Sequence, residues 1–308
     1  MLVSAVDLQE ATRLCVHCPT LCLDSCPVST VEANDAVSPW AKMTLARWLD
    51  TGQVARSPET TAVLYKCTQC GACRDACKHG VNVADALQRA RQDAVKTATS
   101  PLHSQAPHTA ETGDDTILPP GVSGVRLYAA GQLDAFLRVA RDAAERWRTR
   151  AELVFASAED ARCVADIYPL HDLAISLPIR LASATGSEHP ENWTGPVAYH
   201  ESCQIRTCSL GHGEVILKRA RTDSNESLVT WRGVGTDAIC CGAAAPYGDT
   251  SPEGARQAAR RVLERAIAGG AKTLVTGCAG CAQHMKNAID ELPIEVVALG
   301  NPSQTPKE

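Results

Sequence analysis

The chain has 308 residues, a formal net charge of −5, 44% hydrophobic residues and 15 cysteines. This mildly acidic balance provides no basic field for nucleic acid and no polybasic patch for a membrane surface, so we expect no nucleic-acid partner. A disulfide framework is disfavoured as well, because such frameworks belong to short secreted domains and the sequence shows no secretory signal. The sequence contains no uninterrupted stretch of roughly 18 apolar residues, which is about the minimum for a membrane-spanning helix. We therefore expect a protein of at least two domains in the reducing cytoplasm, where thiols stay free.

The first cysteine group lies near the N-terminus and has the short spacing of a metal motif. It reads Cys15-x2-Cys18-x3-Cys22-x3-Cys26 and is followed by Pro27. Thiolates this close in sequence can converge on one point, as an iron–sulfur cluster or a zinc ion requires. The spacing between the second and third cysteines is one residue longer than is usual in bacterial ferredoxins.

The second group, Cys67-x2-Cys70-x2-Cys73-x3-Cys77, follows 40 residues later, with Lys78 where the first group has proline. In bacterial-type ferredoxins, three close cysteines bind one cubane and the fourth binds the neighbouring cluster. We therefore predict two 4Fe-4S clusters, with structural zinc as the alternative. The predicted ligands are Cys15, Cys18, Cys22 and Cys77 for cluster 1, and Cys67, Cys70, Cys73 and Cys26 for cluster 2.

The segments around these groups carry helix signals. Pro39 and Pro58 each follow a serine, which is a typical helix start, and Asn82 precedes an apolar stripe with helical spacing. We predict that residues 1–97 form an α-helical domain built around the clusters.

Residues 98–122 are rich in Ser, Thr, Pro and Gly, which predicts a linker. After it, an α/β alternation begins, with predicted strands at 125–129 and 152–156 and a helix at 133–147. We assign this alternation to a region at 123–195 that carries no cysteine ligands.

Residues 196–308 repeat the alternation, with predicted strands at 197–200, 272–276 and 294–299 and a long helix at 252–268. This pattern predicts a second α/β domain. There is also a weak internal echo between residues 153–157 and 274–278.

A third cysteine set lies within this last region. Its members are Cys203, Cys240, Cys241, Cys278 and Cys281. Since loops after parallel strands gather at one edge of a sheet, we expect the three loops that carry these cysteines to converge there. Gly242, after the vicinal pair, would allow the backbone to approach a metal closely. In the echo, Ser157 and Asp160 stand where two of these cysteines stand, so we expect no metal site there.

Five further residues have weaker claims. Cys163 has no cysteine partner nearby and is expected to be structural, whereas Cys208 could approach the third centre. His17 and His79 adjoin ligand cysteines but are more typical of hydrogen-bonding neighbours. His200 could donate a proton near the third centre, although a histidine satisfied inside the core is the simpler expectation.

The stretch from Cys203 to Cys281, with Cys240-Cys241-Gly242, resembles the cysteine-rich CCG domain of the heterodisulfide reductase superfamily. The segment Tyr199-His200-Glu201-Ser202-Cys203 is similar to the Tyr-His-Asp-Pro-Cys of that group. The N-terminal half resembles its helical ferredoxin domain. The combination resembles the iron–sulfur subunits of glycolate oxidase, anaerobic glycerol-3-phosphate dehydrogenase and lactate-utilisation systems. The resemblance implies an iron–sulfur centre, non-cubane 4Fe-4S or simpler, or a zinc centre on the five cysteines.

The same resemblance implies an electron-transfer subunit. A FAD-containing dehydrogenase subunit would oxidise a hydroxy acid or a polyol phosphate, and a quinone, thiol or carrier protein would accept the electrons. The chain would then be cytoplasmic, or held at the inner face of the membrane by a partner.

Two other classes remain open. The first is a thiol/disulfide oxidoreductase with catalysis at the CCG centre. Members of the superfamily that the chain resembles usually carry two CCG repeats, and the absence of cysteines from the first repeat here disfavours this class. The second is a redox-sensing or assembly protein with structural zinc.

Overall fold

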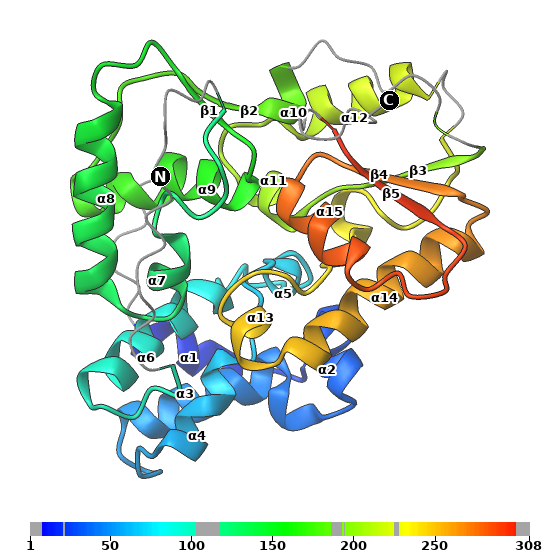
Figure 1. Cartoon of the computed structure of the whole chain (residues 1–308). Helices are drawn as coiled ribbons and strands as arrows, with labels where there is room; N and C mark the ends of the chain where they lie inside the picture. The colour runs from blue at the N-terminus through cyan, green and yellow to red at the C-terminus, as the bar shows by residue number, and fades with distance from the viewer. Residues whose placement is uncertain are drawn as a thin grey trace. The chain divides into compact units, whose positions relative to one another are not determined.

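The computed structural model describes residues 8–20, 22–102, 117–185, 193, 195–224 and 228–299. The chain forms two compact units, and each unit is built from three segments that are separated in the sequence. Figure 1 shows the elements coloured along the chain. The first unit comprises 1–107, 124–138 and 242–258, and the second comprises 108–123, 139–241 and 259–308. Most of the predicted linker, at 103–116, lies outside the described residues.

The first unit is helical, which agrees with the prediction for residues 1–97; its segments 124–138 and 242–258 come from regions predicted as α/β. Its elements are α1 (Leu8–Val16), η1 (Leu23–Ser25), α2 (Pro27–Glu32), η2 (Asp35–Val37), α3 (Pro39–Asp50), α4 (Pro58–Ala62), η3 (Val63–Tyr65), α5 (Ala72–Asp75), α6 (Val83–Lys96), α7 (Val125–Ala129) and α13 (Tyr247–Thr250). The serine–proline starts are confirmed, since Ser38 Oγ accepts a hydrogen bond from the Ala41 N–H at 3.2 Å. Asn82 precedes α6 but bonds Asp85 Oδ2 at 2.6 Å and not a helix N–H.

The predicted strand at 125–129 is wrong, because this segment forms the short helix α7. Gly124 precedes the helix with a positive φ of 75°, and its carbonyl accepts from the Tyr128 N–H at 3.2 Å. A five-residue apolar run fits one helical turn as well as it fits a strand, so tertiary packing decides between the two.

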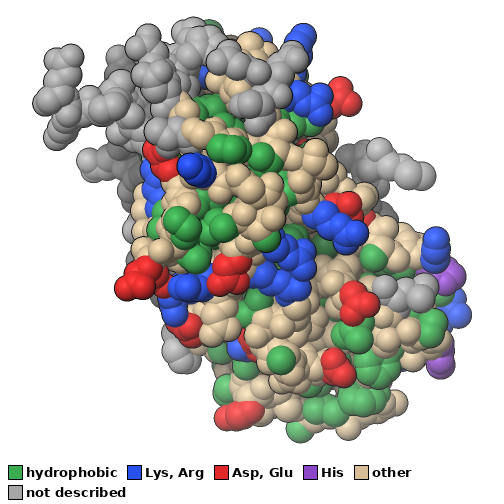
Figure 2. All heavy atoms as spheres, turned by 90° about the vertical axis from the view of Figure 1, so that its right-hand side faces the viewer, with side chains coloured by type: hydrophobic (Ala, Val, Ile, Leu, Met, Phe, Trp, Pro, Cys, Tyr) green, Lys and Arg blue, Asp and Glu red, His purple; other side chains and the backbone are tan. Residues whose placement is uncertain are grey.

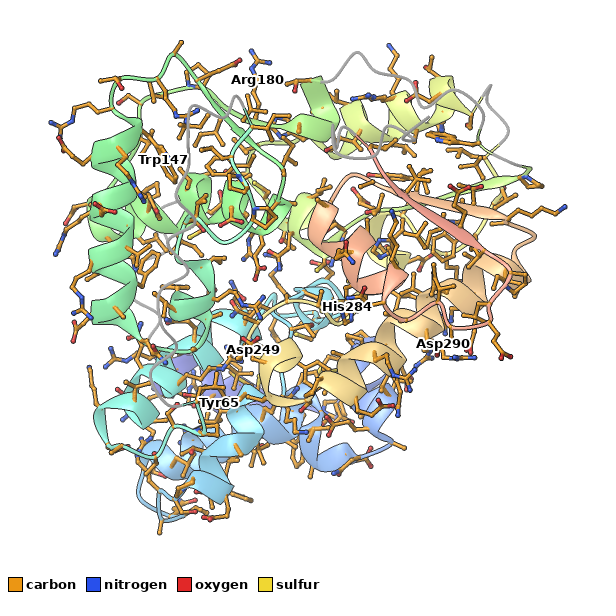
Figure 3. All side chains as sticks on the ribbon, in the orientation of Figure 1. Tyr65, Trp147, Arg180, Asp249, His284 and Asp290 are labelled. Atoms are coloured by element: carbon orange, nitrogen blue, oxygen red, sulfur yellow. The ribbon has the colours of Figure 1, made fainter. Side chains whose placement is uncertain are left out.

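The core of the first unit lies between α1, α3 and α6. Met43, Leu64 and Leu87 are fully buried there, and four half-buried cysteines pack against this core. Tyr65, labelled in Figure 3, joins the 124–138 segment to the core, since its hydroxyl lies 3.1 Å from the Ala130 carbonyl. The cysteine-bearing loops are therefore attached directly to the packed core.

The second unit contains two small parallel sheets. Strand β1 (Leu153–Phe155) pairs with β2 (Ile179–Leu181), and the other sheet has the order β3 (Val197–His200), β4 (Thr273–Thr276) and β5 (Glu295–Ala298). The predicted strands at 152–156, 197–200, 272–276 and 294–299 are thus confirmed within a residue or two. Because β3 and β4 are parallel, their carboxyl ends lie at the same edge.

Short helices connect these strands. They are α9 (Ala158–Arg162), the π-helical turn η4 (Cys163–Ile167), η5 (Tyr168–His171), α10 (Ala182–Thr185), α11 (Cys203–Thr207), α12 (Gly213–Asp223), η6 (Gly235–Asp237) and α15 (Ala279–Lys286). Two longer helices, α8 (Leu133–Trp147) and α14 (Pro252–Ala268), match their predicted ranges. Trp147 (Figure 3) is buried against Phe155, with ring centroids 5.7 Å apart, and against Tyr168.

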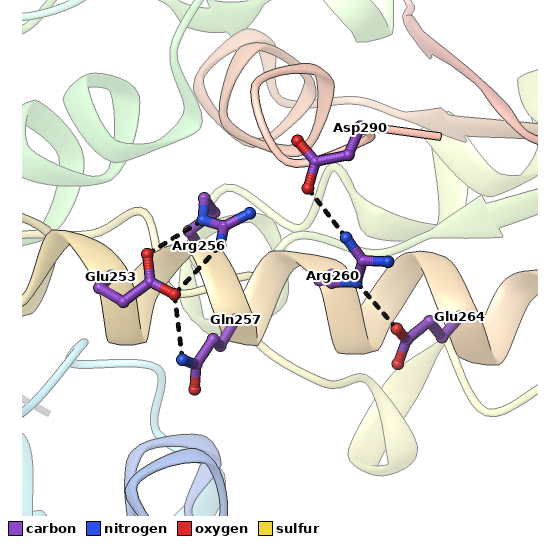
Figure 4. Close-up of polar contacts among 6 residues, drawn as sticks. All are labelled: Glu253, Arg256, Gln257, Arg260, Glu264 and Asp290. Carbon is purple, nitrogen blue, oxygen red and sulfur yellow. Dashed lines mark hydrogen bonds and ion pairs between the residues drawn. The ribbon is translucent and has the colours of Figure 1, made fainter. Parts of the chain in front are cut away.

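The outer face of α14 carries a series of polar pairs. Arg256 and Gln257 bond Glu253, and Arg260 bonds both Glu264 and Asp290 (Figure 4). Exposed pairs of this kind contribute little stability each. On the face drawn in Figure 2, acidic and basic side chains are interspersed. No helix among the described residues is long and apolar enough to cross a membrane.

The internal echo corresponds to two strand–helix units of the same form. Ser157 is the N-cap of α9 after β1, and Cys278 is the N-cap of α15 after β4. Asp160, in the place of a cysteine, is 1% exposed. Its carboxylate accepts hydrogen bonds from the Gly121 N–H at 2.9 Å, the Ser123 N–H at 3.0 Å and the Ser123 hydroxyl at 2.6 Å. The first copy thus holds a closed hydrogen-bond network at this position.

We expect Asp160→Ala to lower the free energy of unfolding by about 3 kcal/mol, because it leaves buried donors without their charged acceptor. The control is Asp142→Ala, which removes an exposed i,i+4 pair with Arg146 and should cost about 0.5 kcal/mol or less. Urea denaturation monitored by circular dichroism measures both. Equal losses in the two variants would contradict a structural role for Asp160.

Candidate iron–sulfur centres

The first unit contains a cavity lined by the predicted cluster 1 set, Cys15, Cys18, Cys22 and Cys77. The local backbone explains how three of them converge. Cys15 lies in the last turn of α1, the Cys18 N–H turns back to the Cys15 carbonyl at 3.0 Å, and Cys22 caps η1. Cys77 arrives from the second motif, just after α5.

A second cavity is lined by the predicted cluster 2 set, Cys26, Cys67, Cys70 and Cys73. Cys26 caps α2, with Pro27 as the first helical residue. Gly71, at φ 75°, turns the chain into α5, which carries Cys73. Cys73 lines both cavities, so the two sites adjoin. The structure therefore brings together both crossed sets; their roles as ligands remain a prediction.

Crowding of thiols changes their acidity in these cavities. Burial, followed by the charges of Cys22, Cys77 and Cys18, raises the pKa of Cys15 to about 12. Burial also raises the pKa of Cys73 well above its usual range, assisted by its cysteine neighbours. Because metal binding requires thiolates, such a site favours a ligand that brings positive charge.

The sulfurs are not arranged for one small ion. Among the residues that the structure describes, no group of three His, Cys, Asp or Glu side chains is close enough to hold a single metal ion. A tetrahedral zinc site would need sulfurs roughly 4 Å apart, given Zn–S bonds of about 2.3 Å. The predicted set of four cysteines at each cavity matches the ligand number of a 4Fe-4S cluster.

The third cysteine set converges at the carboxyl edge of the β3–β4–β5 sheet. Cys203 begins α11 after β3, and Cys278 and Cys281 lie at the start of α15 after β4. All five cysteines of the set are buried. Cys203 Sγ lies 3.7 Å from Cys240 Sγ. Cys281 neighbours Cys241 and Cys278 closely enough for their thiols to affect its pKa. The expected convergence of three loops is therefore present.

This third site distinguishes one sulfur from the others. A hydrogen bond from the Cys281 thiol lowers the pKa of Cys278 against the effect of burial, and the N–H groups of Cys281 and Ala158 and the Ser202 hydroxyl add to this lowering. The pKa of Cys281 is raised in return. The site thus favours a thiolate at Cys278.

Two residues beside the third set hold its loops. His200 is fully buried, and its Nε2 lies 2.9 Å from the Ile239 carbonyl, directly before the vicinal cysteines. Its other ring nitrogen, Nδ1, is buried without a hydrogen-bond partner among the described residues, so the expectation of a satisfied histidine holds for one nitrogen alone. Burial lowers the pKa of His200. Gly242 has a φ of 89°, and a Cβ there would lie 2.9 Å from the Ala255 carbonyl oxygen. Packing on α14 therefore requires glycine here, and its approach to a metal remains a prediction.

The remaining predicted residues have ordinary surroundings. Cys163 is buried, and its thiol lies 3.9 Å from the Ser123 carbonyl, as a structural role requires. Cys208 has a pKa raised to about 11 by burial, with Asp166 and Arg162 as charged neighbours. His79 lines the first cavity, and both His79 and His17 are exposed.

Sequence reasoning missed two buried cations in the first unit, Lys42 and Arg91. Lys42 lines the second cavity, and Arg91 is close enough to Cys67 for the two charges to interact. A signal existed for Arg91, because it lies on the same helical stripe as Leu87 and Ala94 and interrupts an otherwise apolar face. Lys42 gave no comparable signal, since a lysine on α3 is expected on the solvent side.

Comparison with protein families matches two parts of the chain. Residues 11–81 match the model of the 4Fe-4S dicluster domain, and residues 197–286 match the cysteine-rich domain model named CCG. The chain is an iron–sulfur protein with both domains. The same pair of domains occurs in heterodisulfide-reductase-like iron–sulfur proteins. Neither the curated proteins nor the solved structures that were compared gave a match.

In crossed ligation, each cluster takes three cysteines from one motif and the fourth from the other motif. We expect this arrangement to be visible in the iron content of cysteine variants. Cys18→Ser and Cys77→Ser should each remove the iron of one cluster, and the double variant should remove no more, because both residues belong to one site. Cys77→Ser combined with Cys70→Ser should remove the iron of both cubanes. Iron and acid-labile sulfide per chain, measured after anaerobic reconstitution, distinguish these outcomes.

The control is Cys163→Ser, which should keep the full iron content. Crossed ligation is wrong if the loss in Cys77→Ser adds to that in Cys18→Ser but not to that in Cys70→Ser.

Proposed function

We propose that this chain is the electron-transfer subunit of a flavin-dependent dehydrogenase complex, with two 4Fe-4S clusters in the first unit and a third metal centre on the CCG cysteines. The observation that carries the proposal is the pair of adjoining cavities, each lined by cysteines drawn from both motifs. Bound clusters would supply one-electron chemistry, and the protein supplies their thiolates, burial and hydrogen bonds.

Adjoining cavities support a relay more than a single reaction site. Cys73 lines both of them, so electrons would pass between neighbouring centres within one folded unit. In the third centre, the cysteines are all buried, which limits access for a large substrate. We infer that this centre extends the relay toward the acceptor, for which a quinone, a thiol or a carrier protein is suitable.

A flavoprotein partner follows from the chemistry of the donor. Oxidation of a hydroxy acid or polyol phosphate releases two electrons at once, whereas clusters accept them one at a time, and a flavin can convert between the two modes. The resemblance to iron–sulfur subunits of glycolate, lactate and glycerol-3-phosphate dehydrogenases supports such a partner, which would hold FAD and choose the substrate.

We expect anaerobic affinity purification of the tagged full chain from its own host to bring down a stoichiometric flavoprotein. The flavin spectrum and mass spectrometry of the co-purifying chains measure this. Addition of the partner's substrate should then bleach the cluster absorbance. Recovery of iron-loaded protein without any flavoprotein, from cells grown on glycolate, lactate or glycerol, would contradict the proposal.

A second candidate is a thiol/disulfide oxidoreductase that acts at the CCG centre. The convergence of five cysteines at one sheet edge, with the Cys281 thiol 3.4 Å from Ser202 Oγ, favours it. Against it, Asp160 and Ser157 replace cysteines in the first copy, so a two-centre mechanism lacks half of its ligands.

Under this second candidate, Cys278→Ser should abolish reduction of an organic disulfide by the reduced protein, because Cys278 is the favoured thiolate of the set. Cys208→Ser is the matched control and should retain activity. The assay follows thiol release with reduced methyl viologen as electron donor. Full activity in Cys278→Ser would eliminate a catalytic role for the CCG cysteines.

A further inference from the structure

Lys42 is a buried cation at the second cavity. It lies on α3, is 1% exposed, and lines the cavity together with Cys26, Cys67, Cys70 and Cys73. Its ammonium donates a hydrogen bond to the Lys66 carbonyl. Among the described residues, no carboxylate forms an ion pair with Lys42.

Arg91, on α6, is a second buried cation near the same cysteines. It is 0% exposed. Its Nε donates to the Leu64 carbonyl at 2.9 Å and its Nη1 to the Ala129 carbonyl at 3.2 Å. Its third nitrogen, Nη2, is buried without an acceptor among the described residues. Burial lowers the pKa of Arg91, and the charge of Cys67 opposes this effect. Tyr65 acts in the same direction as Cys67, and its ring centroid lies 5.7 Å from the Arg91 guanidinium carbon.

The nearby Lys66 differs from these two residues, because it already has an anionic partner. Its Nζ lies 2.9 Å from Glu32 Oε1 and 2.7 Å from Ser251 Oγ. Lys66 and Glu32 thus largely cancel, whereas Lys42 and Arg91 bring two uncompensated positive charges. Burying an unpaired charge is costly, so a compensating anion is expected close by. The four thiolates of the second cavity, with the cluster they hold, provide that anion.

The first cavity has no such buried charge among its lining residues. Its cationic lining residue, Lys78, is exposed, as is His79. Water and salt screen an exposed charge strongly, whereas a buried charge acts through a lower dielectric. The two cavities therefore differ in electrostatic potential although their cysteine sets are alike.

We propose that Lys42 and Arg91 raise the reduction potential of the cluster held by Cys26, Cys67, Cys70 and Cys73 above that of its neighbour. Reduction adds one negative charge to an already anionic cluster, and nearby buried cations stabilise the reduced form. Burial of Cys26 and Cys70 acts in the opposite direction, and the effect of the two charges must be the larger one for the potential to rise. The Gln69 N–H, 3.4 Å from Cys67 Sγ, acts in the same direction as the cations. Electrons that enter the first unit thus collect at the second cavity.

This inference rests on the proposed function, since it requires cubanes at both cavities. The test is a potentiometric titration of the reconstituted full chain with dithionite, followed by electron paramagnetic resonance. Each step transfers one electron from dithionite and moves no atoms. In Lys42→Met, the equilibrium constant for reduction of the cubane with the highest potential should fall at least tenfold. This fall corresponds to a shift of about 59 mV to lower potential.

Two matched variants separate charge from shape. Lys42→Arg keeps the positive charge, so the equilibrium constant for reduction of this cubane should stay within about threefold of the wild-type value. Lys78→Met removes a cation at the other cavity. Because Lys78 is exposed, the equilibrium constant for reduction of either cubane should change by less than threefold. An unchanged potential in Lys42→Met, or an equal shift in Lys78→Met, overturns the proposal.

Iron and sulfide content decides the case of a variant that does not load. Loss of one cubane in Lys42→Met with full loading in Lys42→Arg supports charge compensation. Loss in both variants assigns Lys42 to packing and overturns the proposal. If the wild-type chain shows no reducible cubane, the proposed function itself fails, which is a separate result.

Discussion

Crowding of eight cysteines into two adjoining cavities is the constraint on which the first unit depends. Burial first, and the neighbouring thiols second, raise the pKa values of Cys15 and Cys73, so these thiols resist ionisation. A ligand of positive character relieves the crowding and joins segments that are distant in sequence. Since Cys77 meets the first motif and Cys26 meets the second, each centre would connect both ends of the helical unit and contribute to its stability.

The same constraint is met differently in the second unit. There, a parallel sheet brings the loops together, and His200 fixes the approach to the vicinal cysteines through the Ile239 carbonyl. At the equivalent place after β1, Ser157 and Asp160 stand where cysteines follow β4, and Asp160 forms a hydrogen-bond network there. One strand–helix form therefore serves either a metal centre or a structural contact, depending on two side chains.

Charge gives the two cavities of the first unit separate properties. Lys42 and Arg91 lack carboxylate partners among the described residues and lie near the second set of cysteines. Backbone carbonyl groups accept hydrogen bonds from both cations, and the Tyr65 ring centroid lies 5.7 Å from the guanidinium carbon of Arg91. No carboxylate of the described residues neutralises them there, so their positive charge remains effective inside the protein. In a relay, a difference in reduction potential determines the direction in which electrons move, whereas the cysteine motifs determine the positions of the clusters.

The sequence by itself determined the three cysteine sets, the starts of α3 and α4, the limits of α8 and α14, and the approximate limits of β1, β3, β4 and β5. These features depend on short spacings, on caps such as Ser38 and on apolar periodicity, all of which are local. It misassigned residues 125–129, because a short apolar run fits a helix or a strand equally well. Only the tertiary structure decided that Lys42 and Arg91 are buried beside the cysteines and that Asp160 replaces a ligand with hydrogen bonds. Burial and charge environment arise from residues distant in the chain, and no local pattern encodes them.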